Sequence, residues 1–387
     1  MTDERTVMII GLGYIGNYAL EFLARTPGIE RIVTSDVSQD GQAKTNNAML
    51  GAAHMGFDPE VEFIPVDLFN IDQTATVLDR VKPQVILSTV SLQSYWVISE
   101  LPPPIFKRLK LGCGYGPWIP NQVTLNYKLM QAVKAAGIDT HVITAGFPDA
   151  TNPVLGKVGL APTIGLGNTD NFIPGVKKLV ARQMEVPETA VTVYLVGHHI
   201  LRTSIKNVDD IDEIPPFYLG IFVDHKDVSH EFDLKKLLVD ETKFVSGWRN
   251  DSKVASSGVK NVLAILNNTR QLTHSPGPNG LVGGYPVRLS RKGAEVVLPP
   301  GITLEEAIKI NEQSQVYDGI EKIEDDGTVV LTDKAVNGMK EILGYGHKRI
   351  RVEENEERAK ELRTLYKKAL QKYTQPNKGP GLLGGAC

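Results

Sequence analysis

The sequence predicts an α/β protein with a doubly wound parallel sheet, followed by an α+β substrate or oligomerisation domain. Short apolar runs, such as 6–10 and 31–35, alternate with segments of helical periodicity in the first half, as in parallel sheets joined by crossover helices. The first of these runs leads into a glycine-rich turn. The second half has a different order, with a strand expected at 190–196 and a strand pair at 284–298, which is typical of an α+β region.

The elements of the first half are assigned from the spacing of their apolar residues. The run at 91–119 contains three consecutive prolines and is expected to be irregular. The crossovers between parallel strands are expected to be right-handed. Strands are expected at 6–10, 31–35, 61–66, 84–90 and 140–145, and helices at 14–25, 40–55, 71–81 and 120–136.

The second half is expected to contain helices near 173–185, 253–271 and 303–316. Residues 350–373 form a highly charged helix, and the tail 374–387 is expected to be flexible or docked on a neighbour. We therefore predict three parts: a dinucleotide-binding domain at 1–150, an α+β catalytic domain at 151–350, and a charged helix with its tail at 351–387.

The composition excludes several classes of protein. The chain has 387 residues and a net charge of −3 with both signs well mixed, so it lacks the basic footprint of a nucleic-acid binder. It has no apolar run near the ~20 residues of a membrane span, and no signal-peptide pattern at its start. The two cysteines, Cys113 and Cys387, are too few for a disulfide framework. We expect a cytoplasmic protein without nucleic-acid or membrane partners.

The turn after the first strand carries the main binding motif. Residues 11–16 read Gly-Leu-Gly-Tyr-Ile-Gly between a strand and a helix, the context of a Rossmann-type dinucleotide site. The first glycine permits the tight turn, the second lets the backbone approach a pyrophosphate, and the third lets helix and strand pack closely. The pyrophosphate would lie at the positive end of the helix. The cofactor-binding residues expected here are Gly11, Gly13, Tyr14, Ile15 and Gly16.

A carboxylate at the end of the second strand bears on the choice of cofactor. Asp36 follows Gly16 by 20 residues, where a carboxylate accepts hydrogen bonds from ribose hydroxyls and repels a 2′-phosphate. NAD is therefore expected, with NADP less favoured, although Ser35 and Ser38 could tolerate a phosphate. Thr89 and Val90, at the end of the fourth strand, are expected beside the nicotinamide half.

Three later segments follow in a recognisable order. Residues 152–155 read Asn-Pro-Val-Leu, 163–171 contain two glycines before Asp170-Asn171, and Gly197-His198-His199 follows a strand. This order resembles the lactate/malate dehydrogenase superfamily, which includes the NAD-dependent family-4 glycosidases. The resemblance covers roughly 7–320, including a late helix and β-hairpin within 254–317.

The resemblance implies roles for four positions. His199, with His198 as the alternative, matches the catalytic histidine of a G-x-H motif. Asp170 matches the carboxylate that orients it, and Asn171 fits equally well without a gap. Asn152 matches an asparagine that contacts substrate and nicotinamide. A histidine with a pKa near neutrality suits the proton acceptor in alcohol oxidation.

Departures from the family pattern limit the substrate. The arginine that clamps a 2-keto acid is replaced by Ile173 or Pro174; Arg202 could replace it or lie on the surface. The stretch 91–119 supplies cations and aromatic side chains, which suggest a larger substrate than lactate or malate, such as a sugar, a polyol or an apolar acid, unless the aromatics only pack the segment. Those cations and aromatics are Lys107, Arg108, Lys110, Tyr95, Trp96, Tyr115 and Trp118.

No cysteine lies near the 152–155 segment, where the family-4 glycosidases need one as a metal ligand, so no metal is expected. Cys113 is interpreted as structural, since reactive thiols need electropositive surroundings.

The leading hypothesis is an NAD-dependent oxidoreductase that transfers a hydride between nicotinamide and an alcohol or carbonyl of a small polar metabolite. Alternatives are a saccharopine-reductase-like or short-chain-type reductase, and a non-catalytic NAD-binding regulatory or scaffold protein. The short-chain type is disfavoured because no Tyr-x-x-x-Lys follows the fourth strand. The position of the two histidines relative to the nicotinamide pocket separates these hypotheses. The resemblance also implies a homodimer or homotetramer, for which helix 350–373 is a candidate contact or simply a solvated face.

Overall fold

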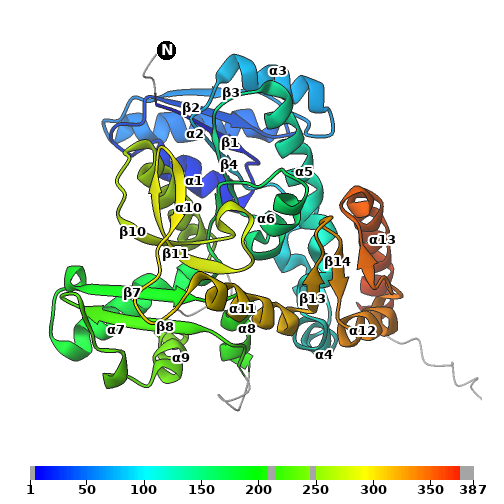
Figure 1. The fold of residues 1–387 in the computed structure, drawn as a ribbon. Helices are drawn as coiled ribbons and strands as arrows, with labels where there is room; N and C mark the ends of the chain where they lie inside the picture. Colours follow the sequence, from blue (N-terminus) through cyan, green and yellow to red (C-terminus); the bar gives the residue numbers. More distant parts are fainter. Residues whose placement is uncertain (1–4, 208–213, 245–249, 375–387) are drawn as a thin grey trace, which may run out of the picture.

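The computed structural model describes residues 5–207, 214–244 and 250–374 (Figure 1). Its centre is a six-stranded parallel sheet of order β3-β2-β1-β4-β5-β6. This sheet confirms the predicted α/β class, and the short sixth strand was not anticipated. The strands are β1 Thr6–Ile10, β2 Arg31–Ser35, β3 Glu60–Phe63, β4 Val85–Ser88, β5 His141–Thr144 and β6 Ile164–Gly165.

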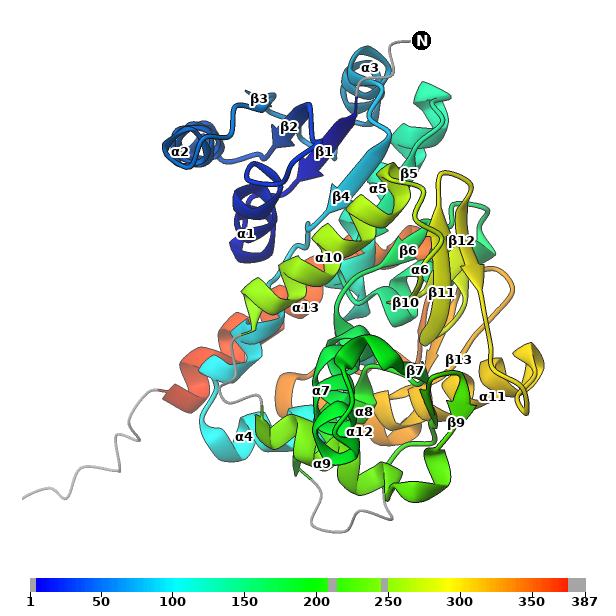
Figure 2. The ribbon, with the colours of Figure 1, turned by 90° about the vertical axis from the view of Figure 1, so that its left-hand side faces the viewer.

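Both faces of this sheet are covered, as expected of a buried parallel sheet. Alternate residues of β1 enter different cores, Val7 and Ile9 on one face and Met8 and Ile10 on the other. On the first face α1 (Tyr14–Leu23) packs against α10 (Asp251–Leu266), a helix from the second half of the chain that runs diagonally beside β4 in Figure 2, and α2 (Asp40–His54) completes the layer. The opposite core includes residues of α3 (Ile71–Val81), α5 (Ile119–Ala136) and α6 (Pro148–Lys157).

The segment between β4 and α5 is more regular than the sequence predicts. It consists of short helical turns, because its apolar residues find partners in the last part of the chain. Leu101, Leu109 and Trp118 are buried in one cluster with residues of α12 (Asp333–Leu343) and α13 (Asn355–Thr374). The turns lie at Tyr95–Glu100, Pro103–Lys107 (α4), Arg108–Cys113 and Gly116–Trp118.

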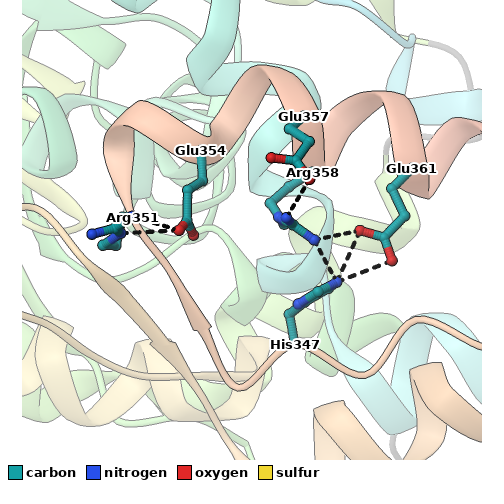
Figure 3. Close-up of polar contacts among 6 residues, drawn as sticks. All are labelled: His347, Arg351, Glu354, Glu357, Arg358 and Glu361. Atoms are coloured by element: carbon teal, nitrogen blue, oxygen red, sulfur yellow. Dashed lines mark hydrogen bonds and ion pairs between the residues drawn. The ribbon is translucent and has the colours of Figure 1, made fainter.

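The charged C-terminal helix is fixed within the molecule. α13 packs on α5, and Tyr366 donates a hydrogen bond from its hydroxyl to the carbonyl of Val97 at 2.6 Å. Nearer the N-terminus of α13, a carboxylate oxygen of Glu361 lies 2.9 Å from Nε2 of His347, a residue that precedes the helix. The same oxygen accepts a hydrogen bond from Arg358 at 2.6 Å (Figure 3). The apolar stripe of α13 therefore has an intramolecular partner. The helix begins at Asn355, and a short strand and a helical turn occupy the start of the range predicted for it.

The second half forms three small antiparallel sheets with surrounding helices. The structure contains the helices and strands predicted near 173–185, 190–196, 284–298 and 303–316. The helix expected at 253–271 spans 251–266. Several other short elements of this half were not predicted. The strands of the three sheets are β7 Val191–Val196, β8 Tyr218–Val223 and β9 Lys226–Asp227; β10 Leu272–Pro276, β11 Gly284–Ser290 and β12 Gly293–Val296; and β13 Ile320–Ile323, β14 Val329–Leu331 and β15 Arg349–Ile350. The helices not yet named are α7 Ile173–Met184, α8 Ile200–Asn207, α9 Leu234–Phe244 and α11 Leu304–Gln315.

The boundary between the first two predicted domains stays a prediction. One hydrophobic core joins β1 residues to α10 and β11, so packing is continuous across it. Among the described residues no helix has the length and apolar character needed to cross a membrane. Residues 375–387, which include Cys387 and nearly all of the predicted tail, lie outside the described residues.

Candidate active site

A cavity of about 750 Å³ opens at the carboxyl ends of β1 and β4. Its wall includes Gly13 from the glycine-rich turn, Thr89 after β4, and His199 after β7. Ligands of doubly wound sheets bind at this edge. The predicted cofactor turn and one of the two predicted histidines therefore face the same space.

The three glycines of the turn differ in their surroundings, and those of Gly11 and Gly16 agree with the tight turn and the close packing expected from the motif. Gly11 adopts a φ of +93°, which favours glycine, and its carbonyl accepts a hydrogen bond from Thr89 Oγ1 at 2.6 Å. A Cβ on Gly16 would overlap the carbonyl of Gly11, so helix and turn can pack only with glycine there. A Cβ on Gly13 would meet nothing within 4 Å and would enter the open space where a pyrophosphate would lie.

The remaining predicted cofactor residues divide into two groups. Tyr14, Ile15 and Val90 line the cavity. Asp36 instead holds the turn, because one carboxylate oxygen accepts from Leu12 N–H at 2.6 Å and the other from Ser38 N–H at 2.8 Å. This fixes the carboxylate at the end of β2.

The surroundings of Asn152 differ from those expected of a residue that contacts nicotinamide and substrate. It is fully buried in α6 and does not line the cavity. Its side-chain oxygen accepts from Thr144 Oγ1 at 2.7 Å and its amide donates to the Gly277 carbonyl at 3.1 Å. Both ends of the amide thus tie α6 to neighbouring segments, so the predicted contact with nicotinamide and substrate does not fit.

His199 is the histidine on the cavity wall. It lies between β7 and α8, and its ring packs edge-on against Phe147, with centroids 4.8 Å apart, and against Tyr115. Its Nδ1 lies 3.1 Å from a carboxylate oxygen of Asp318. Two aromatic rings and one carboxylate therefore hold the imidazole at the cavity.

Asp318, which the sequence analysis missed, positions His199. It is fully buried in a helical turn after α11, and its other oxygen accepts from Tyr115 N–H at 2.6 Å. Burial lowers the pKa of His199, but the carboxylates of Asp318 and Asp149 more than offset this, so the pKa is raised above its ordinary 6.5. The arrangement favours the imidazolium and fixes the ring.

A second buried carboxylate lies behind the histidine. Asp149 accepts a hydrogen bond from His199 N–H at 2.9 Å and another from the Asn168 side chain. Burial raises the pKa of Asp149 to about 6, against the opposing effect of His199. Asp149 therefore fixes the backbone that carries the histidine.

His198 does not line the cavity. It is fully buried, and burial lowers its pKa well below 6.5, so it is neutral. Its Nδ1 lies 3.9 Å from Asp318. The ligand atoms of His198, His199 and Asp318 lie within 4.8 Å of one another, and these are the residue types that bind zinc. Of the described residues, this trio is the one that could hold a metal ion.

Asp170 does not contact the histidine that it was expected to orient. Its carboxylate lies 2.5 Å from Ser257 Oγ and 3.0 Å from Lys260 Nζ, and no ion pair joins it to either histidine of the Gly-His-His motif. Asn171, the alternative, does line the cavity. The carboxylate against His199 is Asp318, from a segment about 150 residues further along the chain.

The segment 91–119 forms one wall of the cavity. Its contributions include Lys110, while Arg108 pairs with Glu341 at 2.7 Å. Cys113 is buried below this wall, and burial raises the pKa of its thiol to about 11, so the thiol stays protonated at neutral pH, consistent with a structural role. The four aromatic residues singled out in the sequence, Tyr95, Trp96, Tyr115 and Trp118, all line the cavity.

Three residues around His199 had weak or no sequence signal. Asp149 shortly follows β5, and a carboxylate near the end of a parallel strand is a usable signal. Phe147 had no sequence signal, and only the structure shows its φ of +50°, which is unusual for a bulky residue. Asp318 has no local signal, because the turn containing it is far from the other site segments in sequence.

Comparison with solved structures shows which proteins share this fold. The chain has the fold of lactate and malate dehydrogenases, which confirms the resemblance at the level of fold. Lactate dehydrogenase MGS-M5 from a Medee basin deep-sea metagenome library has 13% identity over 81% of this chain and 96% of that chain, with a TM-score of 0.56.

Two further structures agree. Lactate dehydrogenase from Cryptosporidium parvum, complexed with lactic acid and nicotinamide adenine dinucleotide, has 16% identity over 82% of this chain and 99% of that chain, with a TM-score of 0.55. Malate dehydrogenase from Aeropyrum pernix has 15% identity over 80% and 95%, also with a TM-score of 0.55. No protein-family model and no curated protein matches the sequence.

Proposed function

We propose that the protein is an NAD-dependent oxidoreductase that interconverts an alcohol and a carbonyl group of a small metabolite, with His199 as the group that accepts or returns the proton. One observation carries this proposal: the glycine-rich turn and the His199–Asp318 pair open onto one cavity. The dehydrogenase fold of the solved structures supports it.

The residues of the cavity divide the work of such a reaction. A nicotinamide held by the glycine-rich turn would supply the acceptor for the hydride of the carbon that bears the hydroxyl group. His199 takes the hydroxyl proton, and Asp318 stabilises the resulting imidazolium and fixes the ring. In the reverse direction the imidazolium returns that proton to the carbonyl oxygen. Phe147 and Tyr115 exclude water from one side of the imidazole.

The structure bears on the alternatives as well. The residues after β4 and His199 line the same cavity, which favours a dehydrogenase with a histidine base over a scaffold that only binds NAD. A short-chain-type reductase, which needs a Tyr-x-x-x-Lys helix, has no counterpart here. The trio of His198, His199 and Asp318 keeps a metal-assisted variant of the same reaction as a second candidate.

NAD is the proposed cofactor, in preference to NADP. Asp36 is held at the end of β2, and a carboxylate at this position of the fold accepts hydrogen bonds from ribose hydroxyls. Ser35 is buried and its hydroxyl donates to the Ile64 carbonyl at 2.6 Å, so it is not free to bind a 2′-phosphate. Lys44, whose amino group donates to the Leu12 carbonyl, is the nearby cation that would weaken this preference.

The test is a screen of hydroxy acids, sugars and polyols for NAD reduction, with the wild type and His199→Ala compared. We expect one substrate class to be oxidised and its rate to fall by about 10²- to 10⁴-fold in His199→Ala, while NADH binding is kept. His230→Ala, in a surface turn, is the matched control. Full activity in His199→Ala would refute the proposed base, and loss of activity in EDTA would favour the metal-assisted variant.

The assembly also stays a proposal. The dehydrogenase fold suggests a homodimer or homotetramer, and light scattering of the purified protein tests it. Because the apolar stripe of α13 packs within the molecule, we do not assign the subunit contact to that stripe.

A further inference from the structure

Two cations lie in the wall of the cavity, on elements far apart in the sequence. Lys110 comes from the segment before α5, and Arg202 from the first turn of α8. We propose that they form an anion-binding subsite, and that the substrate is an acid whose bulky apolar body packs on the aromatic wall of residues 95–118. This inference rests on the proposed function, and it selects an apolar acid over the sugars and polyols.

Within the described part of the chain, the guanidinium of Arg202 uses only part of its hydrogen-bonding capacity. Its Nη1 lies 3.2 Å from Glu241 Oε2 and its guanidinium stacks 4.9 Å from the Phe172 ring centroid. Its Nη2 is buried and has no hydrogen-bond partner among the described residues. A buried donor without a partner costs about 1–3 kcal/mol, so a ligand oxyanion at this position would remove a cost that the free protein bears.

Glu241 does not cancel the charge of Arg202. This fully buried carboxylate also pairs with Lys253, at 3.2 Å. Two cations therefore share one anion, and one positive charge remains beside the cavity. An oxyanion would complete the set, with the fork geometry of a guanidinium suited to two of its oxygens.

Lys110 supplies the second charge. Within the described ranges no ion pair joins it to a carboxylate, and its Nζ lies 5.4 Å from the Phe106 ring centroid. Burial, and then the charge of Lys206, lower its pKa, which is the behaviour of a cation that lacks an anion nearby. Two carboxylates lie in the cavity wall: Asp318 pairs with His199, and Asp251 accepts a hydrogen bond from the Tyr95 hydroxyl at 3.4 Å. No described ion pair joins either of them to Lys110.

The aromatic wall is fixed rather than adaptable. Trp118 is buried and its ring packs edge-on against Tyr366 of α13, with centroids 5.9 Å apart. Tyr366 also holds the Val97 carbonyl at 2.6 Å. Because residues of α12 and α13 pack against this wall, we expect its shape to persist when a ligand binds. Tyr95, Trp96 and Phe106 also line the cavity there.

The pairing of these two surfaces selects the class of ligand. A sugar or polyol would leave both cations without an anion and would place hydroxyl groups against aromatic faces. A small acid such as pyruvate would satisfy the cations but leave the wall uncovered. An anion attached to a ring or a branched apolar group satisfies both, and the anion is a carboxylate or a phosphate.

The test measures binding by calorimetry to the full-length protein, loaded with NAD for the keto acids and phenyl phosphate and with NADH for the alcohols, so that no probe can react with the bound cofactor. The probes are phenylpyruvate, pyruvate, phenyl phosphate, benzyl alcohol and sorbitol. We expect phenylpyruvate or phenyl phosphate to bind at least about tenfold more tightly than pyruvate and than benzyl alcohol. The tighter of the two ring-bearing anions identifies the anionic group. Sorbitol binding as tightly as either, or no binding by any anionic probe, would overturn the proposal.

Variants locate the subsite. Arg202→Gln and Lys110→Gln should each weaken the ring-bearing anion at least about tenfold and leave benzyl alcohol unchanged, whereas Lys107→Gln, on the same segment but outside the cavity wall, should change neither. Lys110→Gln breaks no described ion pair, so it keeps the test valid if Arg202→Gln folds poorly. Wild-type affinity for the ring-bearing anion in Lys110→Gln and Arg202→Gln would refute the subsite.

Failure of the proposed function is distinguishable from failure of this inference. If NADH does not bind, the proposed function fails, and the same probes titrated into the cofactor-free protein still decide the subsite. If NADH binds and only sorbitol or benzyl alcohol binds beside it, the oxidoreductase proposal stands and the anion subsite is wrong.

Discussion

The two ends of the cavity are built in different ways. The proposed cofactor end comes from six consecutive residues, 11–16, whose backbone conformation and three glycines shape the surface. The proposed catalytic end comes from side chains on four separate segments, Asp149, Asn168, His199 and Asp318, which meet only in the folded chain. One end therefore depends on local geometry, and the other on the packing of the whole molecule.

This difference has a consequence for mutation. At the cofactor end a single added methyl group acts through steric overlap or through exclusion of the ligand. At the catalytic end a substitution acts through the electrostatics of a buried pair, so it changes pH dependence as well as rate. The five substitutions below separate these effects.

Asp318→Asn should have the largest effect. The neutral amide no longer offsets the burial of His199, so the pKa of His199 falls. In the wild type this pKa is raised above 6.5, so oxidation, which needs the neutral imidazole, increases as pH rises through that raised value. In the variant the increase should occur at lower pH, and the maximal rate should fall by about 10²-fold or more. A pH–rate profile measures both, and an unchanged profile would contradict the pairing.

Gly16→Ala and Gly13→Ala form a matched pair. The Cβ at position 16 would overlap the Gly11 carbonyl, so the unfolding free energy should fall by about 1–3 kcal/mol. The Cβ at position 13 would meet no protein atom, so stability should change by about 0.5 kcal/mol or less, while NADH binding weakens at least about tenfold. Urea unfolding and NADH titration measure the two. Equal NADH affinity in Gly13→Ala and the wild type would contradict the assigned cradle.

Asp170→Asn tests whether this carboxylate is structural. It removes the ion pair with Lys260, which is 38% exposed, so we expect a loss of about 1–2 kcal/mol, less than for a fully buried pair. The pH–rate profile should match the wild type, in contrast to Asp318→Asn. A shifted profile would restore Asp170 as the carboxylate that acts on His199.

Tyr366→Phe should have the smallest effect. It removes the hydrogen bond to the Val97 carbonyl, so thermal unfolding should show a loss of about 1 kcal/mol. Tyr317→Phe, at an exposed tyrosine, is the control. Because the wall of the cavity rests on α13, ring-bearing acids should lose affinity in Tyr366→Phe while NADH binding is unchanged. Unchanged stability would show that the hydroxyl does not hold the wall.

The sequence predicted the parts of the fold that depend on local periodicity. The five longer strands of the parallel sheet and its crossover helices follow from apolar spacing. The 91–119 segment was predicted to be irregular because its prolines mask its short turns, and its apolar residues acquire partners only from α12 and α13. The helix α6 was missed because the Asn-Pro pair within it reads as a turn.

For the site, the sequence by itself determined the glycine-rich turn and the pair of candidate histidines. The turn is predictable because its function resides in consecutive backbone units. The tertiary structure alone decided that His199 faces the cavity, that His198 is buried, that Asn152 is structural, and that Asp318 replaces Asp170 as the carboxylate against the imidazole. The physical reason is that a buried charge pair needs only proximity and low exposure, and both are produced by packing segments that are remote in the chain.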